Sequence, residues 1–179
     1  MRKTMILVML LVFGVSGLAF AYQNPDSMTL KVLPQTNLSV NIAETEYNFG
    51  TVPLNTVTIS TYAITVTNDS NLQESYNKYV IEDTSPGAWI LVPSSPGNNQ
   101  YALWSKIDAT QPSEAGFDVD YGTVTKDAGE IGDTLVGGGA LTSGAVRSLW
   151  FKLNMPVSVS GVGGNSEQSV TFYIKALAD

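Results

Sequence analysis

Residues 148–154 read Ser-Leu-Trp-Phe-Lys-Leu-Asn, and this stretch decides the fold class. Leu149, Phe151 and Leu153 occupy every second position, and a tryptophan and a lysine lie between them. Because successive side chains of a β-strand point to opposite faces, the pattern predicts a strand with one apolar and one mixed face. Such alternation is typical of antiparallel sheets that pack on one side.

The same two-residue period recurs in both directions along the chain. Residues 101–109 and 170–177 alternate in the same way, and shorter runs rich in Thr, Val, Ile and Tyr lie between Asn, Pro, Gly and Ser residues. The shorter runs cover residues 29–33, 38–43, 47–49, 56–67, 78–82 and 88–92. This series of short strands and turns predicts an all-β fold, an antiparallel β-sandwich.

The run at 56–67 changes phase within itself. Its apolar side chains occupy odd positions up to Ile59 and even positions from Tyr62 onward. A flat strand cannot bury both sets on one face, so we expect a bulge or bend near Ser60 and Thr61.

The first 21 residues have the pattern of a cleaved secretory signal. Arg2 and Lys3 precede an apolar stretch, and Ala-Phe-Ala at 19–21 forms a small-x-small cleavage site. The apolar stretch is shorter than the ~20 residues that a membrane-spanning helix needs. We therefore expect a signal peptide over 1–21, a single domain over 22–179 that is not inserted in a membrane, and a secreted, periplasmic or cell-surface location.

Composition excludes several function classes. The chain has 179 residues, nine of them basic and 16 acidic. Loss of Arg2 and Lys3 with the leader leaves seven basic residues, a net charge of −9, which argues against nucleic acid as a partner. The chain has no His and no Cys, which removes the common nucleophile systems and the commonest zinc ligands. We expect no enzyme activity, although carboxylate chemistry of the glycosidase type needs neither residue.

Residues 110–145 differ from the rest of the chain. They hold eight glycines and six carboxylates, and we interpret them as a long Gly-rich acidic insertion, a loop with at most a small hairpin. Four of the carboxylates could supply the hard oxygen ligands of a calcium ion. These four are Asp118, Asp120, Asp127 and Glu130. The alternative is an acidic loop that is simply solvated, with no cofactor.

Three aromatic residues fall on the mixed faces of predicted strands. They are Trp104, Trp150 and Tyr173. If these faces are open, the rings form a flat platform that could stack on sugars or anchor a protein interface. The alternative is that the 110–145 insertion or the N-terminal segment folds over them and makes a second, smaller core.

Residues 47–52 (YNFGTV) and 64–70 (ITVTNDS) resemble the opening strands of bacterial immunoglobulin-like sandwich domains of the ASH and choice-of-anchor type. The resemblance covers about residues 38–92. It departs from that pattern at Asn55, where a glycine is often expected, and at the 110–145 insertion. The resemblance implies an immunoglobulin-like sandwich that serves as a non-catalytic module of extracellular, adhesive or assembly proteins.

A terminal arm, residues 22–34, would remain after cleavage. It contains the alternating segment Thr-Leu-Lys-Val-Leu at 29–33, which could pair within its own domain or add to the sheet edge of a neighbour. We therefore expect a structural or adhesion module in a surface assembly, whose partners are other extracellular or cell-surface proteins, a second copy of itself included. The alternative is a carbohydrate-binding module that takes a glycan on the aromatic platform.

Overall fold

The computed structural model describes most of the chain beyond the predicted leader. The described residues are 31–32, 37–84, 88–117, 124–127 and 132–178, so the signal peptide and most of the arm lie outside them. Residues 35–179 form one compact unit, separate from residues 1–34, and the following description concerns this unit. Among the described residues, no helix is long and apolar enough to cross a membrane.

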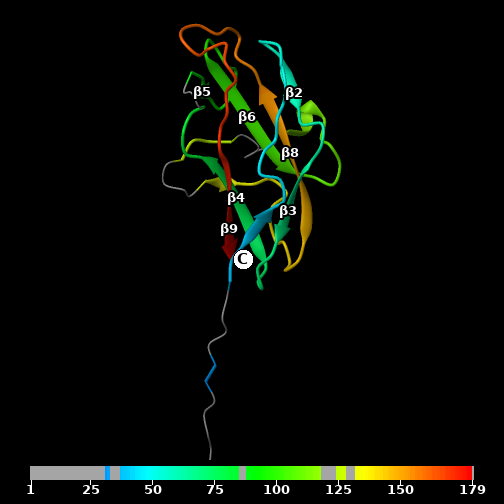
Figure 1. The fold of residues 1–179 in the computed structure, drawn as a ribbon. Helices are drawn as coiled ribbons and strands as arrows, with labels where there is room; N and C mark the ends of the chain where they lie inside the picture. The colour runs from blue at the N-terminus through cyan, green and yellow to red at the C-terminus, as the bar shows by residue number, and fades with distance from the viewer. Residues whose placement is uncertain (1–30, 33–36, 85–87, 118–123, 128–131, 179) are drawn as a thin grey trace, which may run out of the picture. The chain divides into compact units, whose positions relative to one another are not determined.

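The unit is built from two β-sheets, and the prediction of an all-β fold is confirmed (Figure 1). The strands are β1 (Val40–Ile42), β2 (Val57–Ile59), β3 (Ile64–Asn68), β4 (Glu74–Val80), β5 (Ile90–Leu91), β6 (Gln100–Ile107), β7 (Asp133–Thr134), β8 (Val146–Asn154) and β9 (Phe172–Ala178). The helical content of the described residues is one 3-10 turn, η1 (Glu114–Phe117).

The larger sheet has the order β1-β3-β8-β6-β5, and β2 also pairs with β8. Its strands are antiparallel except for β5, which runs parallel to β6. The stretch at 148–154 that decides the fold class lies in β8, which pairs with β6 on one side and with β2 and β3 on the other. The smaller sheet has the order β7-β4-β9, and β4 and β9 pair in an unbroken register of seven residues.

The expected break near Ser60 is confirmed. Ile59 pairs with Lys152 and Ile64 with Leu149, so four residues on this edge face only two on β8. The Ser60 hydroxyl accepts a hydrogen bond from Phe151 N at 3.0 Å, within the break. Ile64 is buried in the main core, whereas Ile59 packs into a cluster on the opposite face. The change of phase therefore reflects a sheet that is covered on both faces.

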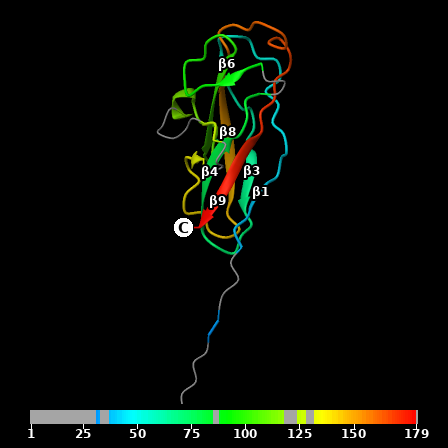
Figure 2. The ribbon, with the colours of Figure 1, turned by 90° about the vertical axis from the view of Figure 1, so that its left-hand side faces the viewer.

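The main core lies between the two sheets (Figure 2). The larger sheet contributes Ile64, Val66, Tyr101, Leu103, Ile107, Leu149 and Phe151 to it. The smaller sheet contributes Tyr76 and Val80 of β4, and Phe172, Ile174 and Ala176 of β9 pack against it. The apolar sets expected to face inward on the three longest alternating runs do so, except for Ala109, which is exposed beyond the end of β6.

The described parts of the 110–145 segment are mostly irregular, and they are packed against the rest of the unit. The segment places Phe117, Val124, Leu135 and Leu141 in the two cores, all at most 2% exposed. Backbone hydrogen bonds of 2.8 Å join Tyr76 to Leu135 and to Gly138. The glycine run is equally tight at its first residue, because a Cβ on Gly137 would collide with the backbone oxygen of Ile107.

Candidate functional site

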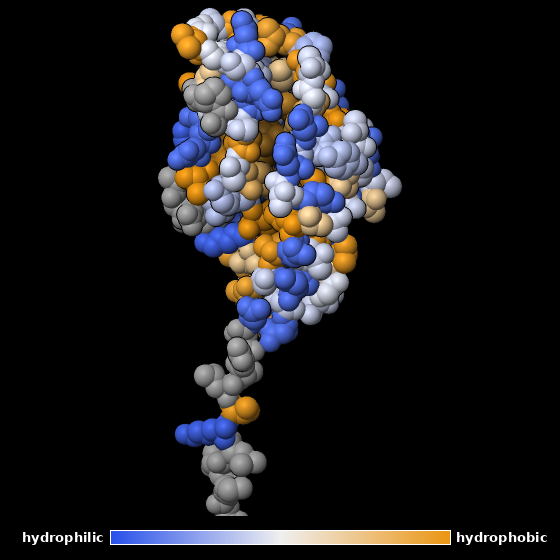
Figure 3. Space-filling view, viewed as in Figure 1, coloured by the Kyte–Doolittle hydropathy of each residue, from blue (hydrophilic) through white to orange (hydrophobic). Residues whose placement is uncertain are grey.

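An apolar groove opens on the inner side of the larger sheet, where the smaller sheet ends. Its volume is about 1180 Å³. Leu103, Phe151 and Leu153 form part of its floor, and its walls are residues 44–54 and 164–172. Figure 3 shows apolar surface in the hollow at the centre of this face, flanked by polar side chains. The groove is therefore an apolar slot with polar rims.

The groove exists because the two sheets differ in width. The smaller sheet ends at β9, and among the described residues β9 pairs with β4 alone. The groove lining reaches β9 at its first residue, Phe172, and continues back along residues 164–171. An edge strand directs alternate N–H and C=O groups away from its own sheet, ready to pair with another chain. The groove thus combines an apolar floor with a wall that leads into an edge strand.

The wall at 44–54 is held by side chains and not by strand pairing. Residues 47–49, expected as a strand, have no strand structure. Glu44 accepts a hydrogen bond from Thr65 N at 2.8 Å, and the Tyr47 hydroxyl accepts one from Thr61 N at 2.7 Å. The Tyr47 ring also lies 4.8 Å from that of Phe49, centroid to centroid. This wall stays in place while its backbone remains outside both sheets.

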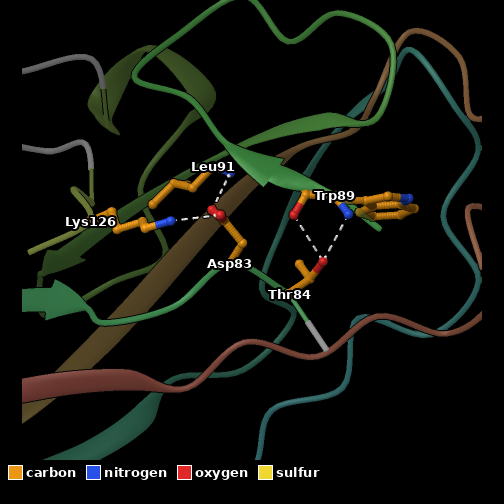
Figure 4. Close-up of polar contacts among 5 residues, drawn as sticks. All are labelled: Asp83, Thr84, Trp89, Leu91 and Lys126. Carbon is orange, nitrogen blue, oxygen red and sulfur yellow. Dashed lines mark hydrogen bonds and ion pairs between the residues drawn. The ribbon is translucent and has the colours of Figure 1, made fainter. Parts of the chain in front are cut away.

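The opposite wall is fixed at the β5 end of the groove. Trp89 donates its ring N–H to Gly164 O at 3.1 Å. The Thr84 hydroxyl lies 3.0 Å from Trp89 N and 2.8 Å from the Gln168 side-chain oxygen. Figure 4 shows the Thr84 hydroxyl bonded to the backbone of Trp89. These contacts join the 164–172 wall to Thr84 and Trp89.

An ion pair supports the same end of the groove. Asp83 lies 2.6 Å from the Lys126 ammonium and accepts a hydrogen bond from Leu91 N at 3.3 Å (Figure 4). The pair is partly exposed, so its contribution to stability is small, typically about 0–1 kcal/mol. Its role is to hold this end of the groove in one position.

Tyr101 places an unsatisfied polar group at the groove. The residue lines the groove and is 2% exposed, and its hydroxyl has no hydrogen-bond partner among the described residues. Burial raises the pKa of Tyr101, and the charge of Asp83 raises it further, so the hydroxyl stays protonated. Leaving a buried polar group unpaired costs about 1–3 kcal/mol. A polar atom of an occupant could satisfy it.

The rims of the groove are acidic. The charged residues among its described lining are Glu44, Glu46 and Glu167. Glu46 and Glu167 are exposed. A cationic side chain on an occupant would find complementary charge there.

The proposed aromatic platform is not formed. Trp104 and Trp150 are 8% and 9% exposed and pack on the outer face of the larger sheet against Phe117 of η1. The Trp150 ring N–H donates to Asp108 O at 3.0 Å, and the Lys152 ammonium lies 4.1 Å from the centre of the Trp104 ring. The 110–145 segment thus covers these rings and makes the second, smaller core that was the alternative interpretation.

Tyr173 lies elsewhere. It belongs to β9 in the smaller sheet, is 37% exposed and stacks on Tyr79 with ring centroids 5.1 Å apart. The structure therefore does not bring the three predicted binding residues onto one surface.

Of the four residues of the calcium prediction, only Asp127 lies within the described residues. Asp118, Asp120 and Glu130 lie outside the described residues, and Asp127 accepts a hydrogen bond from Gly132 N at 2.8 Å. In the described part of the chain, no three or more Asp and Glu residues gather into a metal-binding group. The calcium site remains a prediction.

Sequence reasoning missed the groove. Its lining comes from segments that lie far apart in the sequence, and its volume depends on where the smaller sheet ends. No local sequence pattern shows either feature. The available signal was the pair of alternating apolar stretches, Tyr47 with Phe49 and Val170 with Phe172, that form its two walls. No protein-family model, no curated protein and no solved structure matches this chain, so its function is inferred from the groove itself.

Proposed function

We propose that this protein is a non-catalytic structural module that works outside the cytoplasm, in a surface or adhesive assembly, and that its groove holds an extended segment of a partner protein. The observation that carries the proposal is the apolar groove of about 1180 Å³, whose wall at 164–172 leads into the edge strand β9.

Strand addition explains why these two features belong together. An added strand pairs its backbone with a sheet edge and inserts alternate side chains into the space beside it. The backbone groups would come from the wall at 169–172, where β9 begins, and Phe151, Leu153 and Val170 offer an apolar floor and wall for the side chains. A sugar ligand would instead need hydroxyl-pairing groups along the floor, and the floor here is apolar.

We further propose that the sandwich is of the immunoglobulin-like type. Support comes from the resemblance at residues 47–52 and 64–70 and from the two packed, largely antiparallel sheets. Domains of this type commonly serve as interaction modules, and this analogy agrees with the proposal made from the groove.

The test is a selection of random decapeptides displayed on phage against the chain without its predicted leader. We expect selected peptides that alternate apolar and polar residues and bind at least about tenfold less tightly, about 1.4 kcal/mol, to Leu54→Asp. Leu54 lines the groove and is 42% exposed, so this variant should fold. The matched control is Val146→Asp, which changes an exposed valine outside the groove lining and should leave binding unchanged.

Two outcomes would contradict the proposal. One is selected peptides that bind Leu54→Asp and the unchanged chain equally well. The other is no peptide selection at all together with a shift of tryptophan fluorescence on addition of soluble polysaccharides, which would favour the carbohydrate-binding alternative.

A further inference from the structure

Resting on the proposed function, we infer that the partner segment is Thr29-Leu30-Lys31-Val32-Leu33 of a second copy of this chain. The protein would then assemble by strand donation, each copy placing its arm in the groove of the next. The argument uses the arm's sequence, the charge of the groove, its length and the reach of the chain.

The sequence of the arm matches the chemistry of the groove. In an extended conformation Leu30 and Val32 lie on one face and Thr29 and Lys31 on the other. The first pair can insert between the two walls, against Phe151. The second pair then faces outward, where Lys31 meets the acidic rims of Glu46 and Glu167. The backbone of the arm is left to pair with the wall at 169–172, where β9 begins.

The length also fits. Along β8 the floor runs from Leu149 to Met155, six residue steps or roughly 20 Å at about 3.3 Å per residue. Residues 29 to 33 are four steps apart, about 13 Å on the same measure. The arm therefore fits along the floor without overrunning it.

Chain length favours a second copy over the chain's own arm. Asn37 is anchored to Asn71, which lies beyond the end of β3, by a hydrogen bond of 2.9 Å. Val40 pairs with Asn68, and the adjacent Thr67 pairs with Val146 of β8. The chain therefore joins the unit at the Val146 end of β8.

From this anchor the arm falls short of the far part of the groove floor. Phe151 lies five residues along β8 from Val146, about 17 Å, and Asn37 lies three residues before Val40, about 10 Å further away, which makes about 27 Å in all. Leu30, the outer of the two inserted residues, can lie at most about 25 Å from Asn37. The chain's own arm therefore cannot lie along the floor from Phe151 to Met155, whereas the arm of another copy is not limited in this way.

Donation from copy to copy joins two different surfaces, the arm and the groove. Such a heterologous contact does not close on itself unless the rotation happens to form a ring, and it produces linear chains. We therefore expect the chain without its leader to form a concentration-dependent series of oligomers.

The chain's lack of cysteine allows an unambiguous cross-linking test. A chain with Leu30→Cys is mixed with a chain with Val170→Cys under mild oxidation, and we expect a disulfide-linked heterodimer. Lys31→Cys with Val170→Cys is the matched control for the outward face, and Leu30→Cys with Val146→Cys is the control outside the groove. Both should link at least about tenfold more slowly. A chain with both Leu30→Cys and Val170→Cys should give a ladder of multimers.

Sizing supplies a second measurement on chains free of cysteine. Leu30→Asn with Val32→Asn should weaken self-association at least about tenfold, equivalent to about 1.4 kcal/mol. Thr29→Asn with Lys31→Asn, the matched pair on the other face, should weaken it less, because these residues contact only the rim.

Each other outcome overturns the inference in a recognisable way. If the doubly substituted chain closes on itself as a monomer, the arm occupies its own groove, and a second copy is not the partner. If the arm variants leave self-association unchanged while selected peptides still depend on Leu54, this inference fails and the proposed function stands. If no binding depends on Leu54, both fail.

Discussion

Two parts of this molecule lack long strands and behave in opposite ways. The described parts of the 110–145 segment fill space: Phe117 seals the outer face of the larger sheet, and Leu135 and Leu141 complete the main core. The segments 44–54 and 164–172 leave space, because they stand on either side of the groove. The first segment is joined to β4 by backbone hydrogen bonds, whereas the wall at 44–54 is held by side chains at its margins. The described parts of 110–145 thus cover the two cores, and we call them the cover. The segments 44–54 and 164–172 border the groove, and we call them the frame.

The largest effect should come from removing the cover. Phe117 is fully buried between Trp104 and Trp150 on the outer face. Phe117→Ala should lower the free energy of unfolding by about 3–5 kcal/mol, because it removes a buried ring and leaves a cavity. Urea unfolding followed by tryptophan fluorescence measures this change.

Val162→Ala, at a fully exposed valine, is the control, and its effect should stay within about 0.5 kcal/mol. An equally small effect at Phe117 would mean that the outer face is not sealed by η1, and the contrast between the two segments would be lost.

The glycine run sharpens the same comparison. Gly137 has a φ of +81°, and a Cβ there would collide with Ile107 O, whereas a Cβ on Gly139 would meet nothing within 4 Å. Gly137→Ala should therefore cost about 2–4 kcal/mol through backbone strain and overpacking, and Gly139→Ala should be nearly neutral. The melting temperatures of the two variants measure this difference. Equal values would mean that the glycine run is a flexible loop.

The cover also creates a pH dependence. Lys78 is fully buried in β4, and its ammonium donates to Thr134 O at 3.2 Å. Burial lowers the pKa of Lys78 to about 8, and Asp133 acts in the opposite direction. Between pH 8 and the ordinary pKa of about 10.4 the unfolded chain binds more protons than the folded one, so stability should rise with pH.

The rise should amount to no more than about 3 kcal/mol and should end near pH 10, because burial raises the pKa of Tyr76 and Tyr101 and their ionisation in the unfolded chain then favours unfolding. Lys78→Met should abolish the rise, whereas Arg147→Gln, at an exposed cation, should keep it. Urea midpoints from pH 7 to 10 measure this, and an unchanged slope in Lys78→Met would assign the effect to another group.

The same comparison separates what the sequence could predict from what it could not. The inward sets of β6, β8 and β9 follow from a two-residue period, which acts locally along each strand. The period also identifies the outward set, Trp104 and Trp150, but it cannot show what lies over them. That depends on where Phe117 comes to rest, thirteen residues after Trp104 in the chain. The groove is harder still to predict, because its lining comes from segments that lie far apart in the sequence.

A substitution in the frame should have the smallest effect on the free energy of unfolding and the largest effect on self-association. Leu54 is 42% exposed at the groove, so Leu54→Asp should lower the free energy of unfolding by less than about 1 kcal/mol, well below the cost of changing a buried leucine. If the groove is filled by another copy, binding stabilises the folded state, and the melting temperature of the unchanged chain should rise with protein concentration. Leu54→Asp should remove this dependence and melt at one temperature throughout. A dependence that survives in Leu54→Asp would locate self-association on another surface, and the segments 44–54 and 164–172 would then form the walls of a gap with no role in assembly.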